Sequence, residues 1–115
     1  MNLDAYADEF ARLSAQLDAG LKALRETASA YADAEAAYRR AKAQAWVTAP
    51  SGTVPEREAW VNGETAGDRR ERDFHDSMRQ VALEAVRSRR AQISAMQSIL
   101  AGHRAEAEFA RTGPE

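Results

Sequence analysis

The sequence contains no cysteine and only three prolines among its 115 residues. Without cysteine, the chain has no disulfide framework, no thiolate ligand for zinc and no thiol nucleophile. No apolar run approaches the roughly 20 residues that a transmembrane helix needs. The N-terminal stretch MNLDAYADEF is acidic, whereas a signal peptide is first basic and then apolar. We therefore expect a cytoplasmic protein with no membrane partner.

Bulky side chains are also scarce. Aromatic residues make up 7% of the chain, charged residues make up 30%, and alanine supplies much of the 44% that is hydrophobic. This composition is typical of long helices and coiled coils. A core built from such residues is thin, so we expect the chain to form a homo-oligomer. The 16 basic and 18 acidic residues give a net charge of −2, so the chain lacks the overall positive charge of many nucleic-acid-binding proteins.

Signatures of catalysis and metal binding are missing as well. The sequence contains no phosphate-binding glycine loop, no serine hydrolase elbow and no zincin helix. A two-metal carboxylate bundle needs Glu-x-x-His pairs repeated on separate helices, and the two histidines, His75 and His103, do not provide them. His103 falls at a predicted seam position, which favours a packed or interface histidine. We predict no enzyme, no catalytic residue, no metal, no cofactor and no small-molecule substrate.

The first 48 residues carry apolar or small side chains at a seven-residue spacing. With Leu3 at heptad position a, the a series is Leu3, Phe10, Leu17, Leu24, Tyr31, Tyr38 and Ala45, and the d series is Tyr6, Leu13, Gly20, Thr27, Ala34 and Ala41. A heptad repeat of this length favours a helix that supercoils with another helix. We predict a helix over about 3–48, and the small d residues from Gly20 onward indicate a close approach by the neighbouring helix.

Helix-breaking residues gather once, at about residues 49–53. The stretch APSG at 49–52 ends the first helix, because proline disfavours helix in the residue before it and glycine accepts turn conformations. The stretch TVPE at 53–56 has the spacing of a capping box, with Pro55 in the first helical turn. A loop this short between two helices normally makes them antiparallel.

The second helix is less regular. Trp60, Gly67, Phe74 and Val81 keep a seven-residue spacing with Met78 among them, but Val86, Ile93, Met96, Leu100, His103 and Ala107 follow a different register. We therefore predict a helix over about 54–111 with a phase shift near 81–86, ended by the Gly113-Pro114 stop signal. Because Asn62, Gly63 and Gly67 weaken a helix, the alternative is a kink at 62–67 with a new helix from 68. We favour the continuous or gently bent form.

The distribution of charge supports an antiparallel hairpin. Residues 1–35 hold seven acidic and three basic side chains, whereas residues 77–104 hold five arginines and one glutamate. Folding the chain about residue 51 places these two segments side by side. We predict a single all-α domain, 1–115, that is an antiparallel, coiled-coil-like two-helix hairpin and assembles into a four-helix dimer or a higher oligomer. The predicted hairpin or oligomer seam consists of Leu3, Tyr6, Phe10, Leu13, Leu17, Leu24, Tyr31, Tyr38, Phe74, Met78, Val81, Ile93, Met96 and Leu100.

Basic and aromatic residues cluster near the turn, and a second arginine cluster lies in the C-terminal half. Cations beside flat rings suit single-stranded nucleic acid, with phosphates on Arg and Lys and bases stacked on Trp. The alternative is structural: cations at a helix C-terminus complement its dipole, Trp46 and Trp60 pack on each other, and the C-terminal arginines answer acidic residues. The candidate residues for binding nucleic acid or a partner protein are Arg39, Arg40, Lys42, Trp46, Arg57, Trp60, Arg69, Arg70, Arg87, Arg89 and Arg90.

Three stretches carry a resemblance to a known group of proteins: YRRAKAQAW, GTVPEREAWV and RSRRAQISAMQSILAGHRAEAEFARTGP, within residues 38–114. They resemble small helical-hairpin proteins encoded by bacteriophages of actinobacteria. The resemblance implies a non-enzymatic phage accessory protein that binds nucleic acid in DNA replication or recombination, located in the host cytoplasm. The alternative function is a structural or protein-interaction module, a coiled-coil adaptor to a host or phage protein that does not bind nucleic acid.

Overall fold

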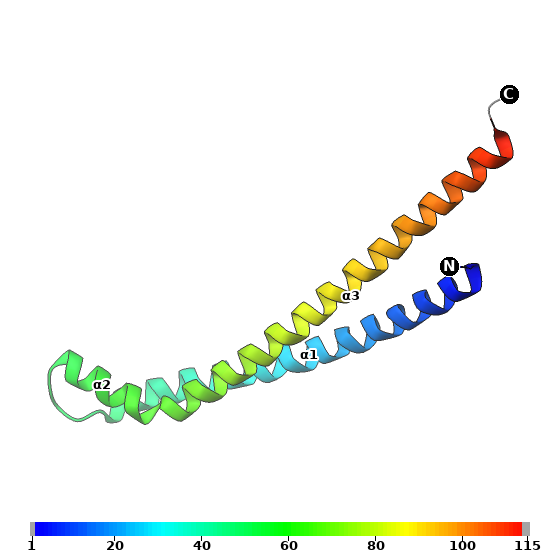
Figure 1. The fold of residues 1–115 in the computed structure, drawn as a ribbon. Coiled ribbons are helices and arrows are strands. Elements are labelled where there is room, and N and C mark those ends of the chain that lie inside the picture. The colour runs from blue at the N-terminus through cyan, green and yellow to red at the C-terminus, as the bar shows by residue number, and fades with distance from the viewer. Residues whose placement is uncertain (1, 114–115) are drawn as a thin grey trace. The chain divides into compact units, whose positions relative to one another are not determined.

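The computed structural model describes residues 2–113, which form three helices (Figure 1). Helix α1 spans Leu3–Thr48, α2 spans Val54–Glu64 and α3 spans Ala66–Thr112. The predicted all-α class is confirmed, and α1 has the bounds expected from the heptad pattern. Pro114, the second residue of the predicted stop signal, lies outside the described residues.

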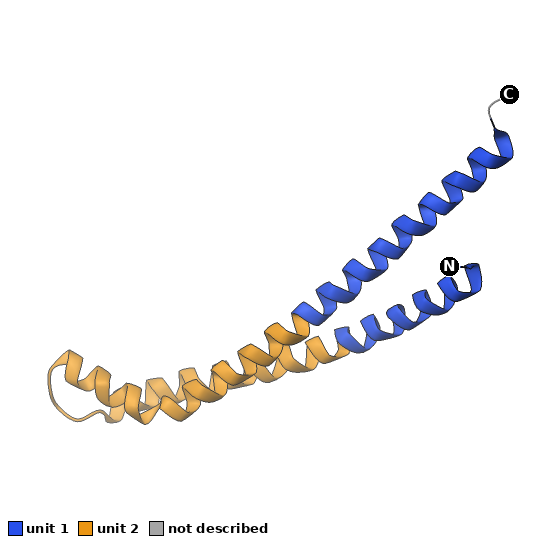
Figure 2. Ribbon diagram, viewed as in Figure 1, with its two compact units in different colours: residues 1–21, 84–115 blue, residues 22–83 orange. Residues whose placement is uncertain are grey.

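The chain divides into two compact units (Figure 2). Unit 1 contains Met1–Leu21 and Glu84–Glu115, and unit 2 contains Lys22–Leu83. Within each unit a segment of α1 packs antiparallel to a segment of α3, and in unit 2 the loop and α2 connect the two. The antiparallel helical hairpin expected from the short loop is therefore confirmed.

Unit 1 has a small apolar core. Tyr6, Leu13 and Met96 are its buried members, and the half-buried side chains packed against them are Phe10, Ile93 and Leu100. Further along, Gly20 lies close to the buried Val86, because a Cβ atom added to Gly20 would stand 3.4 Å from Val86 Cγ2. The small d position at residue 20 thus meets a neighbouring helix at close range.

The burial along α1 follows the predicted heptad register. Residues of the a and d series are buried or half-buried, with Leu3 as the exception among them. Leu3 is 75% exposed because it is the first residue of α1. Leu3 therefore does not belong to the seam within the hairpin, and its predicted place there is wrong.

The face that α3 turns toward α1 differs from the predicted one. Most of the buried or half-buried positions follow one alternating spacing of four and three residues: Asp68, Arg72, His75, Arg79, Ala82, Val86, Arg89, Ile93, Met96 and Leu100. Asp76 and Leu83, each next to a member of this series, are half-buried as well. The expected phase shift near 81–86 is absent from this series in the described part of α3. Phe74, Met78 and Val81 are instead exposed, by 55%, 43% and 65% of their surfaces, so they do not belong to the seam within the hairpin.

The physical reason for this difference is a polar seam in unit 2. The Arg72 guanidinium lies 4.6 Å from the centre of the Tyr38 ring, and the Arg79 guanidinium lies 5.1 Å from the centre of the Tyr31 ring. A guanidinium over an aromatic face is attracted by the ring quadrupole while its aliphatic stem covers apolar surface. Arg72 and Arg79 therefore form the seam with α1 in unit 2, where the apolar pattern predicted that Phe74 and its neighbours would form it.

The second predicted helix is divided at Thr65. This residue is buried, and its hydroxyl donates a 2.8 Å hydrogen bond to the Val61 carbonyl. Such a bond competes with the backbone ladder and bends helices. The backbone bonds Thr65 N to Val61 O and Arg69 N to Thr65 O persist at 3.0 Å, so the interruption is limited to one residue. The predicted second helix, which we favoured as continuous or gently bent, is therefore two helices. The break falls within the 62–67 stretch of the alternative, and the new helix begins at Ala66 rather than at 68.

The start of α2 uses the predicted capping residues. The Thr53 hydroxyl accepts a 3.3 Å hydrogen bond from the Glu56 amide, which satisfies one of the free N–H groups at the helix start. Pro55 lies in the first turn, where no amide hydrogen is needed. The loop is also fixed from inside, because Arg57 Nη2 donates a 3.1 Å bond to the Trp46 carbonyl at the end of α1.

Candidate functional site

Several of the predicted cations near the turn already interact with groups of their own unit. Arg39 Nε lies 2.9 Å from Glu35 Oε1, and the Lys42 ammonium lies 5.9 Å from the centre of the Tyr38 ring. The Arg57 guanidinium lies 5.7 Å from the centre of the Trp46 ring. Arg40 is exposed and, within residues 2–113, has no ion pair. Three of the six predicted cations near the turn, Arg39, Lys42 and Arg57, are thus occupied by contacts within unit 2.

The two tryptophans do not pack on each other. Among the described residues no ring pair joins Trp46 to Trp60; the close ring pair is Phe74 with His75, 5.2 Å apart. Arg57 covers Trp46, and Trp60 is half-buried beside two shallow hollows of unit 2, one of them lined by Pro50, Ser51, Glu56 and Arg57. The structural interpretation of the tryptophans as a stacked pair is therefore wrong, and Trp60 is not presented as a free stacking platform.

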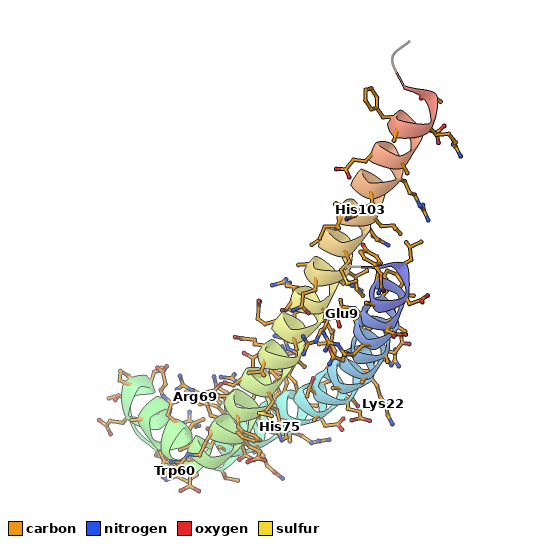
Figure 3. The ribbon with its side chains drawn as sticks, turned by 45° about the vertical axis from the view of Figure 1, so that its right-hand side comes forward. Glu9, Lys22, Trp60, Arg69, His75 and His103 are labelled. Carbon is orange, nitrogen blue, oxygen red and sulfur yellow. The ribbon has the colours of Figure 1, made fainter. Side chains whose placement is uncertain are left out.

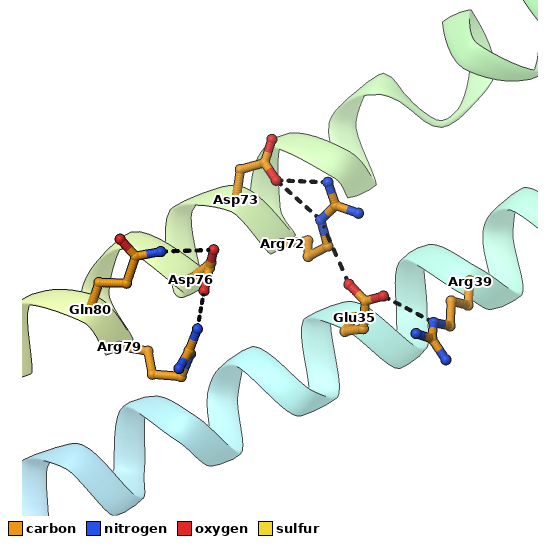
Figure 4. A network of polar contacts seen from close by, with 7 residues as sticks. All are labelled: Glu35, Arg39, Arg72, Asp73, Asp76, Arg79 and Gln80. Carbon is orange, nitrogen blue, oxygen red and sulfur yellow. Dashed lines mark hydrogen bonds and ion pairs between the residues drawn. The ribbon is translucent and has the colours of Figure 1, made fainter. Parts of the chain in front are cut away.

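The centre of unit 2 holds a polar network between α1 and α3 (Figure 4). Glu35 of α1 accepts from Arg39 and lies 3.6 Å from Arg72 Nε of α3. Arg72 also donates to Asp73 Oδ1 at 2.8 Å, and this hydrogen bond raises the pKa of the Arg72 guanidinium. One carboxylate therefore links the two helices.

A second part of the network lies entirely on α3. Arg79 Nη2 donates to Asp76 Oδ1 at 2.6 Å, and Gln80 Nε2 donates to Asp76 Oδ2 at 3.2 Å (Figure 4). Each carboxylate in the network is thus held by a guanidinium. The arrangement pairs the acidic side chains of this part of the seam with basic and amide groups.

Arg69 and Arg70 stand at a groove on the outer side of unit 2. The groove has a volume of about 500 Å³ and is lined by Asn62, Ala66, Arg69, Arg70, Asp73, Phe74 and Ser77. Both arginines are exposed, and within the described residues neither forms an ion pair. The structure therefore places two of the predicted cations beside an exposed ring, and that ring belongs to Phe74 rather than to a tryptophan.

Phe74 also begins an apolar strip along α3, which sequence reasoning assigned to a seam and the chain does not bury. Phe74, Met78 and Val81 occupy positions i, i+4 and i+7, which lie on one face of a helix. We call these three residues the outer strip. Their seven-residue spacing was the available signal in the sequence, but it could not distinguish a seam within the hairpin from one that faces another chain.

The predicted C-terminal arginines belong to unit 1. Arg87 Nη1 lies 2.9 Å from Glu84 Oε1, and Arg89 Nη1 donates to Gln92 Oε1 at 3.0 Å. Arg90 is exposed. Two of the three arginines therefore satisfy neighbours one turn away on α3, and they do not form a free phosphate-binding row.

The histidines lie in different surroundings. His75 Nε2 is 3.3 Å from Glu71 Oε1 on the same helix, and His103 of α3 lies in unit 1, as does Glu9 of α1 (Figure 3). Across residues 2–113 no three His, Asp or Glu side chains gather in an arrangement that could hold a metal ion. In the same span no helix combines the length and the apolar character needed to cross a bilayer.

Comparison of the chain with family models, with curated proteins and with solved structures finds no match. The surfaces of unit 2 that remain open to a partner are the outer strip and the groove lined by Arg69 and Arg70.

Proposed function

We propose that this chain is a non-enzymatic protein-interaction module whose outer strip binds an amphipathic helix of a partner protein. The observation that carries the proposal is the alignment of Phe74, Met78 and Val81 on one face of α3 with about half of their surface exposed. Single exposed apolar residues are ordinary on protein surfaces. Three bulky ones at i, i+4 and i+7 form the pattern by which helices bind one another.

The energetics favour a partner on this strip. Burying one bulky apolar side chain completely contributes about 1.5–3 kcal/mol. The outer strip retains roughly half of that area in water, so covering its three side chains would contribute about 2–4 kcal/mol before the cost of association. This contribution supports a reversible complex that needs further contacts at the rim.

Positive charge at one end of the outer strip indicates that the partner helix carries an acidic residue there. Arg69 and Arg70 lie one turn before Phe74 and line the same groove. A partner helix with apolar side chains at a seven-residue spacing and an acidic residue facing these arginines would match the surface in shape and sign. Such charge complementarity mainly contributes orientation and association rate.

A photo-crosslinking amino acid at position 81 tests the proposal, with the same amino acid at position 47 as the matched control. Val47 is 84% exposed on α1, so it offers equal access without the strip. We expect a discrete adduct with one protein from position 81 and none from position 47. Binding of that purified protein should then weaken at least tenfold in Met78→Asp and remain unchanged in Val47→Asp. Equal adducts at both positions, or unaltered binding by Met78→Asp, would contradict the proposal.

A second candidate function is binding of single-stranded nucleic acid in the groove of unit 2. The observation that favours it is the juxtaposition of two unpaired arginines with the exposed Phe74 ring and the Asn62 side chain along one open groove. Phosphates would pair with the arginines, and a base would stack on the ring, a contact worth about 1–3 kcal/mol. The likeness to phage hairpin proteins associated with DNA metabolism agrees with this candidate.

Fluorescence anisotropy of labelled single-stranded DNA separates the two candidates, because the required residues overlap only in part. Nucleic-acid binding requires Arg69, Arg70 and Phe74, and it should weaken as salt rises. Met78→Ala and Val81→Ala should leave DNA binding intact, whereas they should weaken the binding of a partner helix to the outer strip. Absence of binding at low salt, where electrostatic attraction is strongest, would exclude the nucleic-acid candidate.

A further inference from the structure

The last part of α3, in unit 1, is exposed to solvent along its described length. Every residue from 101 to 113 is exposed, although the helix continues to Thr112. We call residues 101–112 the α3 end. The α3 end therefore leaves a helical surface uncovered that another molecule can contact.

The neighbouring core contains a polar group without a partner. Tyr6 is only 8% exposed, and its buried hydroxyl has no hydrogen-bond partner among residues 2–113. Two open grooves meet at this residue. The first, about 510 Å³, has an apolar wall of Tyr6, Leu13, Met96 and Ile99, and its polar lining residues are His103, Gln92 and Glu9. The second, about 520 Å³, lies between Leu3, Leu100 and Ala107. His103 lines both. A buried hydroxyl without a hydrogen-bond partner destabilises the fold. The first groove therefore has an apolar wall beside a hydroxyl that can still donate a hydrogen bond.

The sequence of the α3 end matches this groove when a second copy runs antiparallel to the first. Ile99, His103, Glu106 and Ala110 lie on one face of α3, because their spacings are four, three and four residues. A two-fold axis between residues 104 and 105 places Ile99 of one copy opposite Ala110 of the other, and His103 opposite Glu106. Because of the symmetry, each of these pairs occurs twice in the dimer. An isologous interface requires such self-complementarity. Within the described residues, Glu106 forms no ion pair in its own chain, so its carboxylate is free for this contact.

We infer that two copies of the chain associate through unit 1, with their α3 ends antiparallel and each laid along the other's Tyr6 groove. Glu106 of the second copy then reaches the groove that Tyr6 and His103 line, where its carboxylate accepts the hydrogen bond of the Tyr6 hydroxyl. Ile99, now 53% exposed, becomes covered. This inference does not depend on the proposed function, because it uses a different surface and a different partner.

Sedimentation equilibrium of charge variants tests the interface. His103→Glu places a new carboxylate opposite Glu106 at two symmetric positions, so we expect the dimer dissociation constant to rise at least tenfold. The double variant His103→Glu with Glu106→His exchanges the two partners, so its dimer dissociation constant should return to within about threefold of the wild-type value. Gln97→Glu adds the same charge at an exposed position outside this face and should leave the dimer unchanged. Circular dichroism verifies that each variant remains helical.

Tyr6→Phe provides a second measurement that a loss of folding cannot imitate. Removing a buried hydroxyl that has no partner among the described residues should leave the monomer at least as stable as the wild type. Losing its bond to the second copy should nevertheless weaken the dimer by about threefold to tenfold. Met78→Asp, in unit 2, should leave the dimer intact. A monomeric wild-type protein, a dimer unaffected by His103→Glu, failure of the exchange to restore it, or a dimer strengthened by Tyr6→Phe would overturn the inference.

Discussion

At the scale of single residues, the clearest electrostatic contact in unit 1 joins Glu9 to Arg12. Arg12 donates two hydrogen bonds to the two oxygens of the carboxylate, one of them from Nε at 2.9 Å. The two side chains lie three residues apart on α1, where helical geometry places them side by side. This hydrogen bonding, together with the charge of Arg12, holds the pKa of the Glu9 carboxyl below its ordinary value.

The lowered pKa of Glu9 predicts a direction for the pH dependence of stability. A carboxyl whose pKa is lower in the folded state stabilises the fold above its unfolded pKa, and this contribution is lost as the pH falls through the folded pKa. NMR titration should therefore find Glu9 below the ordinary glutamate range, and Arg12→Gln should return it to that range. The difference in unfolding free energy between wild type and Arg12→Gln should shrink toward acid pH. An unchanged Glu9 titration in the variant would contradict this assignment.

At the scale of helices, the sequence predicted α1 better than α3. The register of α1 follows from its apolar heptad, because Phe10, Leu13, Leu17 and Leu24 occupy the positions that pack against α3. In α3 the same reasoning chose Phe74 and Val81, which are exposed. Apolar periodicity cannot detect a seam made of arginine over tyrosine, since it counts a guanidinium as a surface group.

The candidate surfaces show the same limit. The charge of Arg69 and Arg70 marks them as candidates in the sequence. The exposed ring beside them belongs to Phe74, which the heptad spacing predicts to lie in the seam. Sequence alone also could not show that Arg39, Arg57 and Arg87 are occupied within the chain, since Glu35, the Trp46 carbonyl and Glu84 become their partners only once the helices form.

The polar seam of unit 2 predicts a measurable coupling between Tyr31 and Arg79. We expect a double-mutant cycle with Tyr31→Leu and Arg79→Leu to give a favourable coupling of about 0.5–1 kcal/mol, as for a partly exposed cation and ring. Chemical denaturation monitored by circular dichroism provides the four free energies. The same cycle with Arg40, an exposed arginine of unit 2, in place of Arg79 should show no coupling. Zero coupling between Tyr31 and Arg79 would mean that their contact does not stabilise the seam.

At the scale of the whole molecule, few side chains are fully removed from water. The buried set consists of Tyr6, Leu13, Ala45, Val61, Thr65, Val86 and Met96. Hydrophobic burial is the main favourable term in folding, and the ordering of more than a hundred residues opposes it. A chain with so thin a core is marginally stable alone, and any association of its folded form adds stability by mass action.

Thermal unfolding should therefore depend on protein concentration. If folded chains associate, each tenfold rise in concentration shifts the equilibrium away from the unfolded monomer, and Tm should rise by several degrees over a roughly hundredfold range. Differential scanning calorimetry measures this shift directly. His103→Glu should flatten the dependence if the α3 ends form the interface, whereas Met78→Asp should flatten it if copies meet through the outer strip instead. A Tm that stays constant over the whole range would show that the hairpin folds as an independent monomer, and the thin core alone would then have to account for its stability.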